Sequence, residues 1–307
     1  MSDASTKAAP SAEPPARAER EFTVKERTQF QIVLSRFLRH RAAVVSLVVL
    51  LLIILWAYLG QRVWPRAYNW LEGPGSAAPS LQYPMGTDEV GHDYFSRVMR
   101  GAQQSLNVAF LVALLSTAIG APYGAIAGYF GGRVDMVMMR IVDVMLTLPV
   151  IAVAGMLTQY LRGTWWVVAL ILAGFGWVVN ARVVRGVVLS LREQEFIEAA
   201  RALGASDARV IFRHLIPNVT GVLIVQATLD IAGAILAEAG LSFIGLGIQG
   251  PDTSLGLLTN LSQEAVGTRP WLFYFPGLTI IAIALTINFI GDGLRDALDP
   301  RQTRQRR

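Results

Sequence analysis

Residues 193–217 read EQEFIEAARALGASDARVIFRHLIP. This polar stretch stands between two apolar segments, at about 165–183 and 219–243, and each approaches the roughly 20 residues that cross a bilayer as a helix. Residues 193–203 are good helix formers, Gly204 is a natural helix end, and Ser206 can cap a second short helix that Pro217 ends. We therefore predict a helix–turn–helix segment at 193–217 that a membrane protein exposes to water.

This segment has two chemically different faces in the predicted helices. Four apolar side chains recur at helical spacing and are expected to share one face: Phe196, Ile197, Ala200 and Leu203. Arginines lie along the other face: Arg201, Arg209 and Arg213. A surface-lying connector and a docking segment for another protein both fit this pattern.

The composition of the whole chain is that of a membrane protein. Of its 307 residues 53% are hydrophobic and only 16% are charged, whereas a soluble domain carries roughly 25% charged residues. The apolar runs do not alternate, which excludes a β-barrel. The absence of cysteine excludes disulfides, thiolate metal ligands and cysteine nucleophiles. The predicted fold is an all-α, polytopic membrane protein.

Six apolar runs predict six membrane-spanning helices, at about 42–60, 106–129, 136–161, 165–183, 219–243 and 272–290. Pro149 is expected to kink the third. The remaining parts are an amino-terminal tail with a basic surface helix (1–41), an external loop and helix (61–100) that Thr87 or Asp88 would cap, and a basic tail (301–307). Residues 101–300 then form the core of the protein.

The basic residues orient this topology. Both termini and residues 182–217 fall on one side of six spans, and that side holds all but six of the 27 lysines and arginines. The six others are Arg62, Arg66, Arg97, Arg100, Arg162 and Arg269. Because basic residues are enriched on the cytoplasmic side, both termini and the polar segment are expected in the cytoplasm of a prokaryotic inner membrane. The net charge of +5 is explained by this placement and does not indicate nucleic-acid binding.

The segment 193–217 resembles the signature of the membrane subunits of ATP-binding-cassette importers. The resemblance rests on Glu198, Ala199, Ala200, Gly204 and Pro217. In that family this segment is the coupling helix that sits in a groove of the ATPase. His214 and Ile216 depart from the usual isoleucine and leucine, and His-Leu-Ile-Pro-Asn is similar to the variant found in peptide importers.

Three further stretches are similar to C-type subunits of the dipeptide, oligopeptide and nickel importers. They are residues 84–97, residues 238–247, and residues 291–300 with the sequence GDGLRDALDP. His92 replaces the arginine that is usual in the first stretch, which leaves an ion pair at that position open. The likeness covers about residues 30–300.

The resemblance implies partners and a division of labour. A B-type permease subunit, two ATP-binding subunits and an external binding protein would join this chain, with lipid around its spans. The only lysines are Lys7 and Lys25 and neither follows a glycine, so the chain has no phosphate-binding loop. ATP and magnesium would lie on the partner subunits, and this chain would be neither an enzyme nor a holder of cofactors or metals.

Small and ionisable residues inside the spans are the other candidates. Gly120, Gly124 and Gly128 predict a flat helix face for close packing. Asp143, Asp230 and Glu238 are costly inside a membrane, and they either line the translocation path and meet a peptide's amino terminus or form interhelical hydrogen bonds.

Three alternative functions differ in what they require of the sequence. An intramembrane hydrolase would need a paired nucleophile and base, but His40, His92 and His214 all lie outside the spans. An ion-coupled secondary transporter would fit the spans but would need no docking segment. Uptake of nickel or a nickel chelate is the alternative within the family.

Overall fold

The computed structural model describes residues 29–298, and every regular element in this range is a helix. The helices are α1 (Gln29–Phe37), α2 (Arg41–Val63), α3 (Tyr94–Phe130), α4 (Gly132–Thr147), α5 (Val150–Tyr160), α6 (Trp165–Leu191), α7 (Glu195–Ala202), α8 (Asp207–Arg209), the π-helical turn η1 (Val210–Leu215), α9 (Ile216–Phe243), α10 (Leu255–Leu261) and α11 (Pro270–Leu298). The predicted tails at 1–28 and 301–307 lie outside the described residues.

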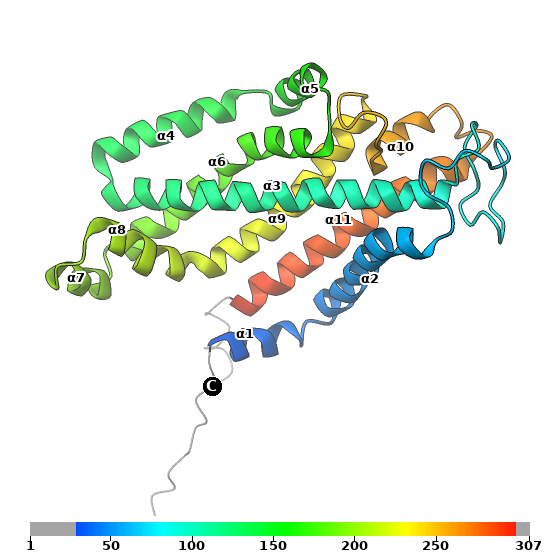
Figure 1. Cartoon of the computed structure of the whole chain (residues 1–307). Coiled ribbons are helices and arrows are strands. Elements are labelled where there is room, and N and C mark those ends of the chain that lie inside the picture. The colour runs from blue at the N-terminus through cyan, green and yellow to red at the C-terminus, as the bar shows by residue number, and fades with distance from the viewer. Residues whose placement is uncertain (1–28, 299–307) are drawn as a thin grey trace, which may run out of the picture.

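The long helices form an elongated bundle with two distinct ends (Figure 1). Five helices are long and apolar enough to cross a membrane, and the pair α4 and α5 makes a sixth span if its two halves are taken together. One end of the bundle carries α7 and α8, and the opposite end carries the loop between α2 and α3 together with α10 (Figure 1). The all-α, polytopic fold expected from composition is confirmed.

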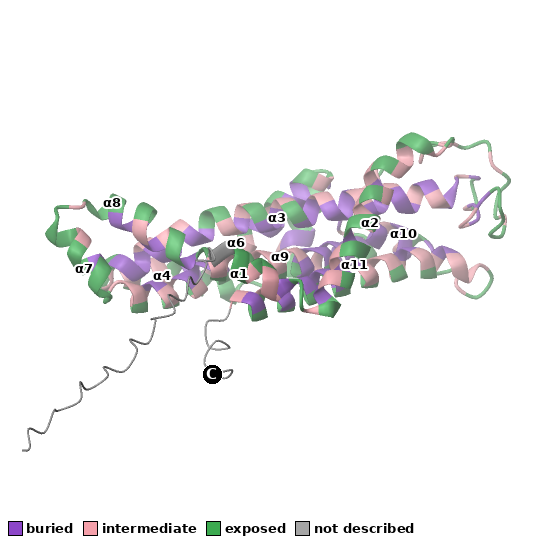
Figure 2. Ribbon diagram, turned by 90° about the horizontal axis from the view of Figure 1, so that it is seen from below, coloured by how far each residue is buried: buried purple, intermediate pink, exposed green. Residues whose placement is uncertain are grey.

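Buried residues run along the inside of the bundle, while α7 and the outward faces of the long helices are exposed (Figure 2). The largest cluster of buried apolar side chains joins α2, α3, α9 and α11. Outward residues of α2 such as Val45 and Leu52 are apolar although exposed. Apolar exposure of this kind on a spanning helix suits contact with lipid.

The three glycines of α3 allow it to lie directly against α6. A Cβ added to Gly124 would stand 2.2 Å from the carbonyl oxygen of Ala181, and one on Gly120 would stand 2.6 Å from that of Trp177. A Cβ on Gly128 would lie 3.0 Å from the carbonyl oxygen of Arg185. Backbone-to-backbone contact of this kind is what small residues at four-residue spacing permit.

The third predicted span is broken. α4 ends at Thr147, α5 begins at Val150, and the two are bent by 78° across Leu148 and Pro149. Proline lacks an N–H and disfavours a helical residue before it, so the chain separates at this point. The expected kink is therefore a complete interruption of the helix.

Two predicted helix boundaries are wrong. The N-cap of α3 is Asp93, whose side chain accepts from Phe95 N–H, and neither Thr87 nor Asp88 caps it. Pro217 does not end a helix but lies in the first turn of α9, directly after the π-helical turn η1. α8, η1 and α9 therefore form one helical run from Asp207 to Phe243.

The basic surface helix expected within residues 1–41 ends before the first span begins. α1 ends at Phe37, and His40 caps a separate helix, α2, by accepting from Ala43 N–H at 3.2 Å. Phe37 is buried and lies beside Gly293 of α11. This contact fixes α1 against the bundle.

Candidate functional site

The polar segment 193–217 folds as a short helix, a tight turn and a second helical run. α7 ends in a Schellman motif, in which Ala205 N–H donates to Ala200 C=O at 3.0 Å and Gly204 N–H donates to Arg201 C=O at 2.9 Å. Gly204 has a φ of +80°, which glycine adopts without penalty. Ser206 then caps α8 by accepting from Arg209 N–H at 3.4 Å. The helix–turn–helix shape follows from these local contacts.

Buried apolar side chains hold this segment against the bundle. Ile197 of α7 and Val210, Ile211 and Leu215 of η1 are all buried, and they join one cluster with residues of α3 and α6. Fully burying a side chain of this size contributes roughly 1.5–3 kcal/mol. Four such residues make α7, η1 and the ends of α3 and α6 one packed unit.

A polar contact reinforces this unit. The Tyr129 hydroxyl of α3 donates to Asp207 Oδ1 at 2.6 Å, and the guanidinium of Arg201 lies 4.8 Å from the centre of the Tyr129 ring. Tyr129 therefore touches α7 and α8 at once. Arg192 donates to the carbonyl of Gly128 at 3.0 Å, which ties the start of the segment to the end of α3.

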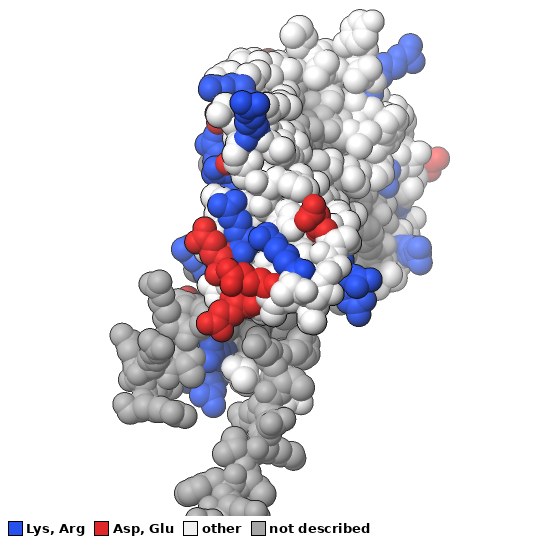
Figure 3. All heavy atoms as spheres, turned by 90° about the vertical axis from the view of Figure 1, so that its left-hand side faces the viewer, with Lys and Arg blue, Asp and Glu red and all other residues white. Residues whose placement is uncertain are grey.

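The outer surface of the segment is apolar at its tip and charged around it. Leu203 is 89% exposed, Phe212 56% and Phe196 42%. The expected apolar face is therefore wrong in part: Ile197 is buried, whereas Phe196 and Leu203 face outward. Leu203 follows the last residue of α7, so helical spacing does not fix its direction. Figure 3 looks onto this end of the bundle and shows acidic and basic side chains gathered on it.

The signature residues contribute unequally to this surface. Glu198, Ala199 and Pro217 are exposed, and Ala200 is half-buried. Within residues 29–298 the side chains of Glu198, Arg209 and Arg213 form no ion pair. Three charges and an exposed leucine are thus free to meet another protein.

Two of the three acids within the spans have partners that satisfy them. Asp143 forms an ion pair with Arg182 at 2.6 Å, and both side chains are about half exposed. Glu238 is fully buried and accepts from the hydroxyls of Ser105 and Ser242, each at 2.7 Å. Sequence spacing alone could not pair Asp143 with Arg182, which lie on α4 and α6.

Asp230 is the third acid, and it borders a cavity of about 280 Å³ between α3, α6, α9 and the α4–α5 break. Its Oδ2 accepts from Asn180 Nδ2 at 2.6 Å, and its Oδ1 lies 3.4 Å from Gln226 Nε2. Asn180 lies on α6, so this hydrogen bond joins α6 to α9.

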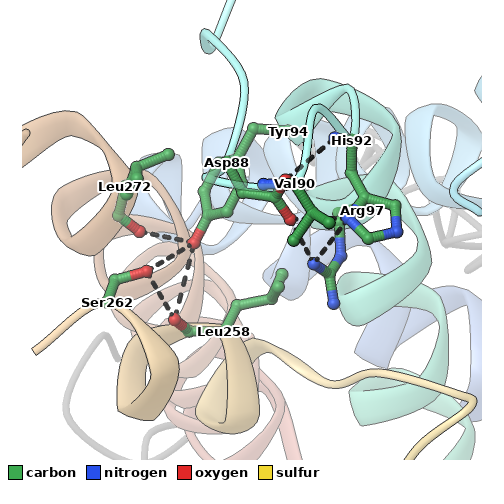
Figure 4. A network of polar contacts seen from close by, with 8 residues as sticks. All are labelled: Asp88, Val90, His92, Tyr94, Arg97, Leu258, Ser262 and Leu272. Atoms are coloured by element: carbon green, nitrogen blue, oxygen red, sulfur yellow. Dashed lines mark hydrogen bonds and ion pairs between the residues drawn. The ribbon is translucent and has the colours of Figure 1, made fainter. Parts of the chain in front are cut away.

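At the opposite end of the bundle, Asp88 organises the approach to α3 (Figure 4). Its carboxylate accepts from the backbone and ring of His92, at 2.8 and 2.7 Å, and from Arg97 Nη1 at 2.6 Å. Burial raises the pKa of Asp88, but these hydrogen bonds and the charge of Arg97 outweigh burial and hold the pKa below its usual value. His92 thus keeps a contact with an acid although it replaces arginine.

Two further contacts at this end were missed from the sequence. Arg100 binds both oxygens of Asp252 at 2.8 Å, and Gln104 also donates to Asp252. The Tyr94 hydroxyl donates to Leu272 C=O at 2.6 Å and contacts Ser262 (Figure 4). These bonds fasten the loop before α10 and the start of α11 to α3. Only the polar character of 97–104 could have indicated the contacts of Arg100 and Gln104, and no sequence pattern indicated those of Tyr94.

No group of three or more His, Asp or Glu residues within 29–298 is arranged to hold a metal ion.

Comparisons with known proteins identify the family of this chain. A family model described as binding-protein-dependent transport system inner membrane component matches residues 120–304. A second, described as the N-terminal TM domain of oligopeptide transport permease C, matches residues 28–83. The first match covers more than half of the chain and includes the segment 193–217.

Relatives over nearly the full length agree. The oligopeptide transport system permease protein OppC of Mycobacterium tuberculosis (strain H37Rv) is 43% identical over 279 residues, covering 90% of this chain and 96% of that protein. OppC of Haemophilus influenzae is 38% identical over 286 residues, covering 92% and 91%. The chain therefore belongs to the binding-protein-dependent transport system inner membrane components, as a C-type permease subunit of the ATP-binding-cassette importers.

Proposed function

We propose that this chain is one of two pore-forming subunits of an ATP-driven importer of di- or oligopeptides. The peptide cargo is supported by the relatives, which are oligopeptide permeases. The other components of the importer would be those expected from the sequence: a B-type permease subunit, two ATP-binding subunits and an external binding protein. The bound nucleotide and magnesium belong to the ATP-binding subunits.

One observation carries the coupling role: Leu203 is 89% exposed at the tip of a segment that Ile197 and Leu215 anchor in the bundle. A large apolar side chain in that position favours burial against another protein. The uncompensated charges of Glu198, Arg209 and Arg213 lie on the same segment and can pair with charges on the same partner. We therefore assign the segment to the ATPase groove, with Leu203 as the apolar anchor and the charges as its rim.

The anchoring of the segment supports its action as a lever. Ile197 and Leu215 are fully buried, and Tyr129 links α3 to α8, so a push on α7 is passed to α3, α6 and α9 together. When ATP binding closes the two ATPases, these helices would swing between inward-open and outward-open arrangements. Both termini and the segment would then lie in the cytoplasm, as the distribution of arginines predicts.

The docking role can be tested by charge insertion at Leu203. We expect Leu203→Glu to reduce co-purification of the ATP-binding subunits with the permease pair by about tenfold, because it places a charge in an apolar contact. Leu81→Glu is the matched control, since Leu81 is 104% exposed at the opposite end of the bundle. Wild-type recovery of the ATPases with Leu203→Glu, together with normal uptake, would remove the segment from the interface.

A further inference from the structure

The cavity beside Asp230 has the size and walls of a binding site. Its volume is about 280 Å³, it is open on one side, and residues of α3, α6 and α9 line it where the α4–α5 pair is broken. An apolar protein cavity of roughly 150 Å³ already accepts benzene, so this one has room for an amino-acid side chain. Most of the wall is apolar, with side chains that include Val112, Met145, Leu172, Phe175 and Leu229.

Asp230 places a carboxylate in this apolar wall without a positive partner. Its contacts are the amide nitrogens of Asn180 at 2.6 Å and Gln226 at 3.4 Å, and no basic side chain within 29–298 forms an ion pair with it. An ionised group inside a membrane protein is costly unless it is paired. A cation that enters the cavity would supply the missing partner.

A hydroxyl in the wall of the same cavity also lacks a hydrogen-bond partner. Ser116 is fully buried, lines the cavity, and its Oγ has no partner. Asn180 does not line the cavity, and its contribution is the hydrogen bond from its Nδ2 that orients Asp230. Buried polar atoms are nearly always paired in native proteins, so an unpaired hydroxyl in a wall that also holds an unpaired acid indicates a ligand that donates hydrogen bonds.

The broken helix brings two helix ends to the same place. Met145 and Leu146 of the last turn of α4 line the cavity, and so does Val150, the first residue of α5. The partial charges of a helix C-terminus and a helix N-terminus are opposite, so the charge in this cavity is set by Asp230. Broken helices near the middle of a membrane are also where transporters place substrate groups.

We propose that this cavity binds the amino-terminal ammonium group of a peptide in transit. The ammonium would donate to Asp230, with Ser116 Oγ as a further acceptor, and the first side chain would lie against the apolar walls. An ammonium has three donors, and the two carboxylate oxygens and the hydroxyl oxygen can accept from them. A bare metal ion such as calcium prefers six to eight oxygen ligands, and apolar walls do not supply them. The assignment rests on the proposed function and adds a specificity site to it.

The first test compares peptides that differ only at the amino terminus. Uptake of trialanine and N-acetyl-trialanine is measured in proteoliposomes that hold the complete importer, with wild-type chain or Asp230→Asn. The external binding protein is the same in every assay, so its own preference cancels when the two uptake ratios are compared. We expect Asp230→Asn to lower the ratio of free to acetylated peptide uptake by about tenfold, the effect of one charge-assisted hydrogen bond.

Asp292→Asn is the matched control, because Asp292 is an exposed aspartate on α11 away from the cavity. It should leave the ratio unchanged. An unchanged ratio in Asp230→Asn would overturn the ammonium site while leaving the importer assignment intact. Failure of the wild-type complex to take up either peptide with ATP would instead overturn the proposed function and the inference together.

A second measurement does not depend on transport. Gly233 lines the cavity, and a Cβ added there meets nothing within 4 Å, so Gly233→Cys introduces a thiol into a chain that has no cysteine. In a complex whose other subunits carry no reactive thiol, cationic 2-aminoethyl methanethiosulfonate should modify it faster than the anionic sulfonatoethyl reagent, and Asp230→Asn should lower the ratio of the two rates about tenfold, toward the ratio for a free thiol. Equal rates in both backgrounds would overturn the site.

Discussion

Gly204 shows how one backbone angle shapes the coupling segment. Its φ is +80°, and nothing lies within 4 Å of the position that a Cβ would take. The requirement for glycine is therefore conformational and not steric. For other residues the left-handed backbone conformation costs roughly 1–2 kcal/mol, and the cost is smaller for asparagine than for branched residues.

Gly204→Val should uncouple ATP hydrolysis from transport. The strain opens the Schellman turn and displaces Leu203, so uptake per ATP hydrolysed should fall several-fold while the amount of protein inserted in the membrane stays the same. Gly204→Asn is the control and should keep most of the coupling, because asparagine tolerates the left-handed conformation. Normal uptake by the valine variant would refute this role of the turn.

Asp88 is a second position where a single side chain has a measurable effect. Its pKa is lowered from 3.8, so its contribution to stability is present above that value and is lost as the pH falls through the lower pKa of the folded state. Asp88→Asn should destabilise the protein by about 1.5–3 kcal/mol at pH 7. The difference in melting temperature from wild type should shrink below about pH 4.

The melting experiment on Asp88→Asn needs a control variant that loses a carboxylate without losing the contacts of Asp88. Glu89→Gln removes a neighbouring carboxylate that is 73% exposed, and an exposed pair contributes only about 0–1 kcal/mol. A pH-independent effect of Asp88→Asn would mean that the carboxylate is not what holds this turn.

At the scale of elements, the contact between α3 and α6 depends on glycine. Gly124→Ala would place a Cβ 2.2 Å from the Ala181 oxygen, and backbone cannot move aside without separating the two helices. We expect a loss of about 1–3 kcal/mol, seen as a lower melting temperature of the purified complex.

Gly174→Ala on α6 is the matched substitution for this contact. A Cβ there meets nothing within 4 Å, so alanine should be neutral or stabilise the helix by up to about 1 kcal/mol. Equal melting temperatures for the Gly124 and Gly174 variants would contradict the close approach of the two helices.

Much of the helical framework could be predicted from the sequence, because runs of about 20 apolar residues leave few alternatives in a membrane. Boundaries were less predictable. Asp88 and Asp93 are equally good caps by composition, and only the contacts of Asp88 with His92 and Arg97 decide between them. Pro217 can end one helix or begin another. Leu215 is buried in the cluster that joins η1 to α3 and α6, and α9 continues the helix from there, so Pro217 lies at the beginning of α9.

The coupling segment was predictable in shape but not in its exposed face. Gly204 and Ser206 signalled the turn and the cap, and both lie where expected. Periodicity grouped Ile197 with Leu203, although Leu203 lies beyond the last helical residue and faces outward. The environment of Asp230 depends on Asn180 and Ser116 of two other helices, which no local pattern could bring together.

For the whole molecule, the orientation in the membrane is a prediction from the arginine distribution, and the separation of the two ends makes it testable. Leu81 and Leu203 lie at opposite ends and both are largely exposed, so each can carry a single cysteine in a chain that has none. A membrane-impermeant maleimide should label Leu81→Cys in spheroplasts, and Leu203→Cys only in inside-out vesicles from cells that lack the ATP-binding subunits, which would otherwise cover residue 203. The reverse pattern would invert the topology.

The central claim is that ATP hydrolysis on partner subunits drives peptide uptake through this chain. It is tested most directly with proteoliposomes that hold the complete importer, in which ion gradients are collapsed by ionophores and trialanine uptake is followed. The account predicts accumulation with ATP on the cytoplasmic side and none with a non-hydrolysable analogue. In a second arm the ionophores and ATP are left out and an ion gradient is imposed. Accumulation in that arm would contradict the account and would identify an ion-coupled transporter.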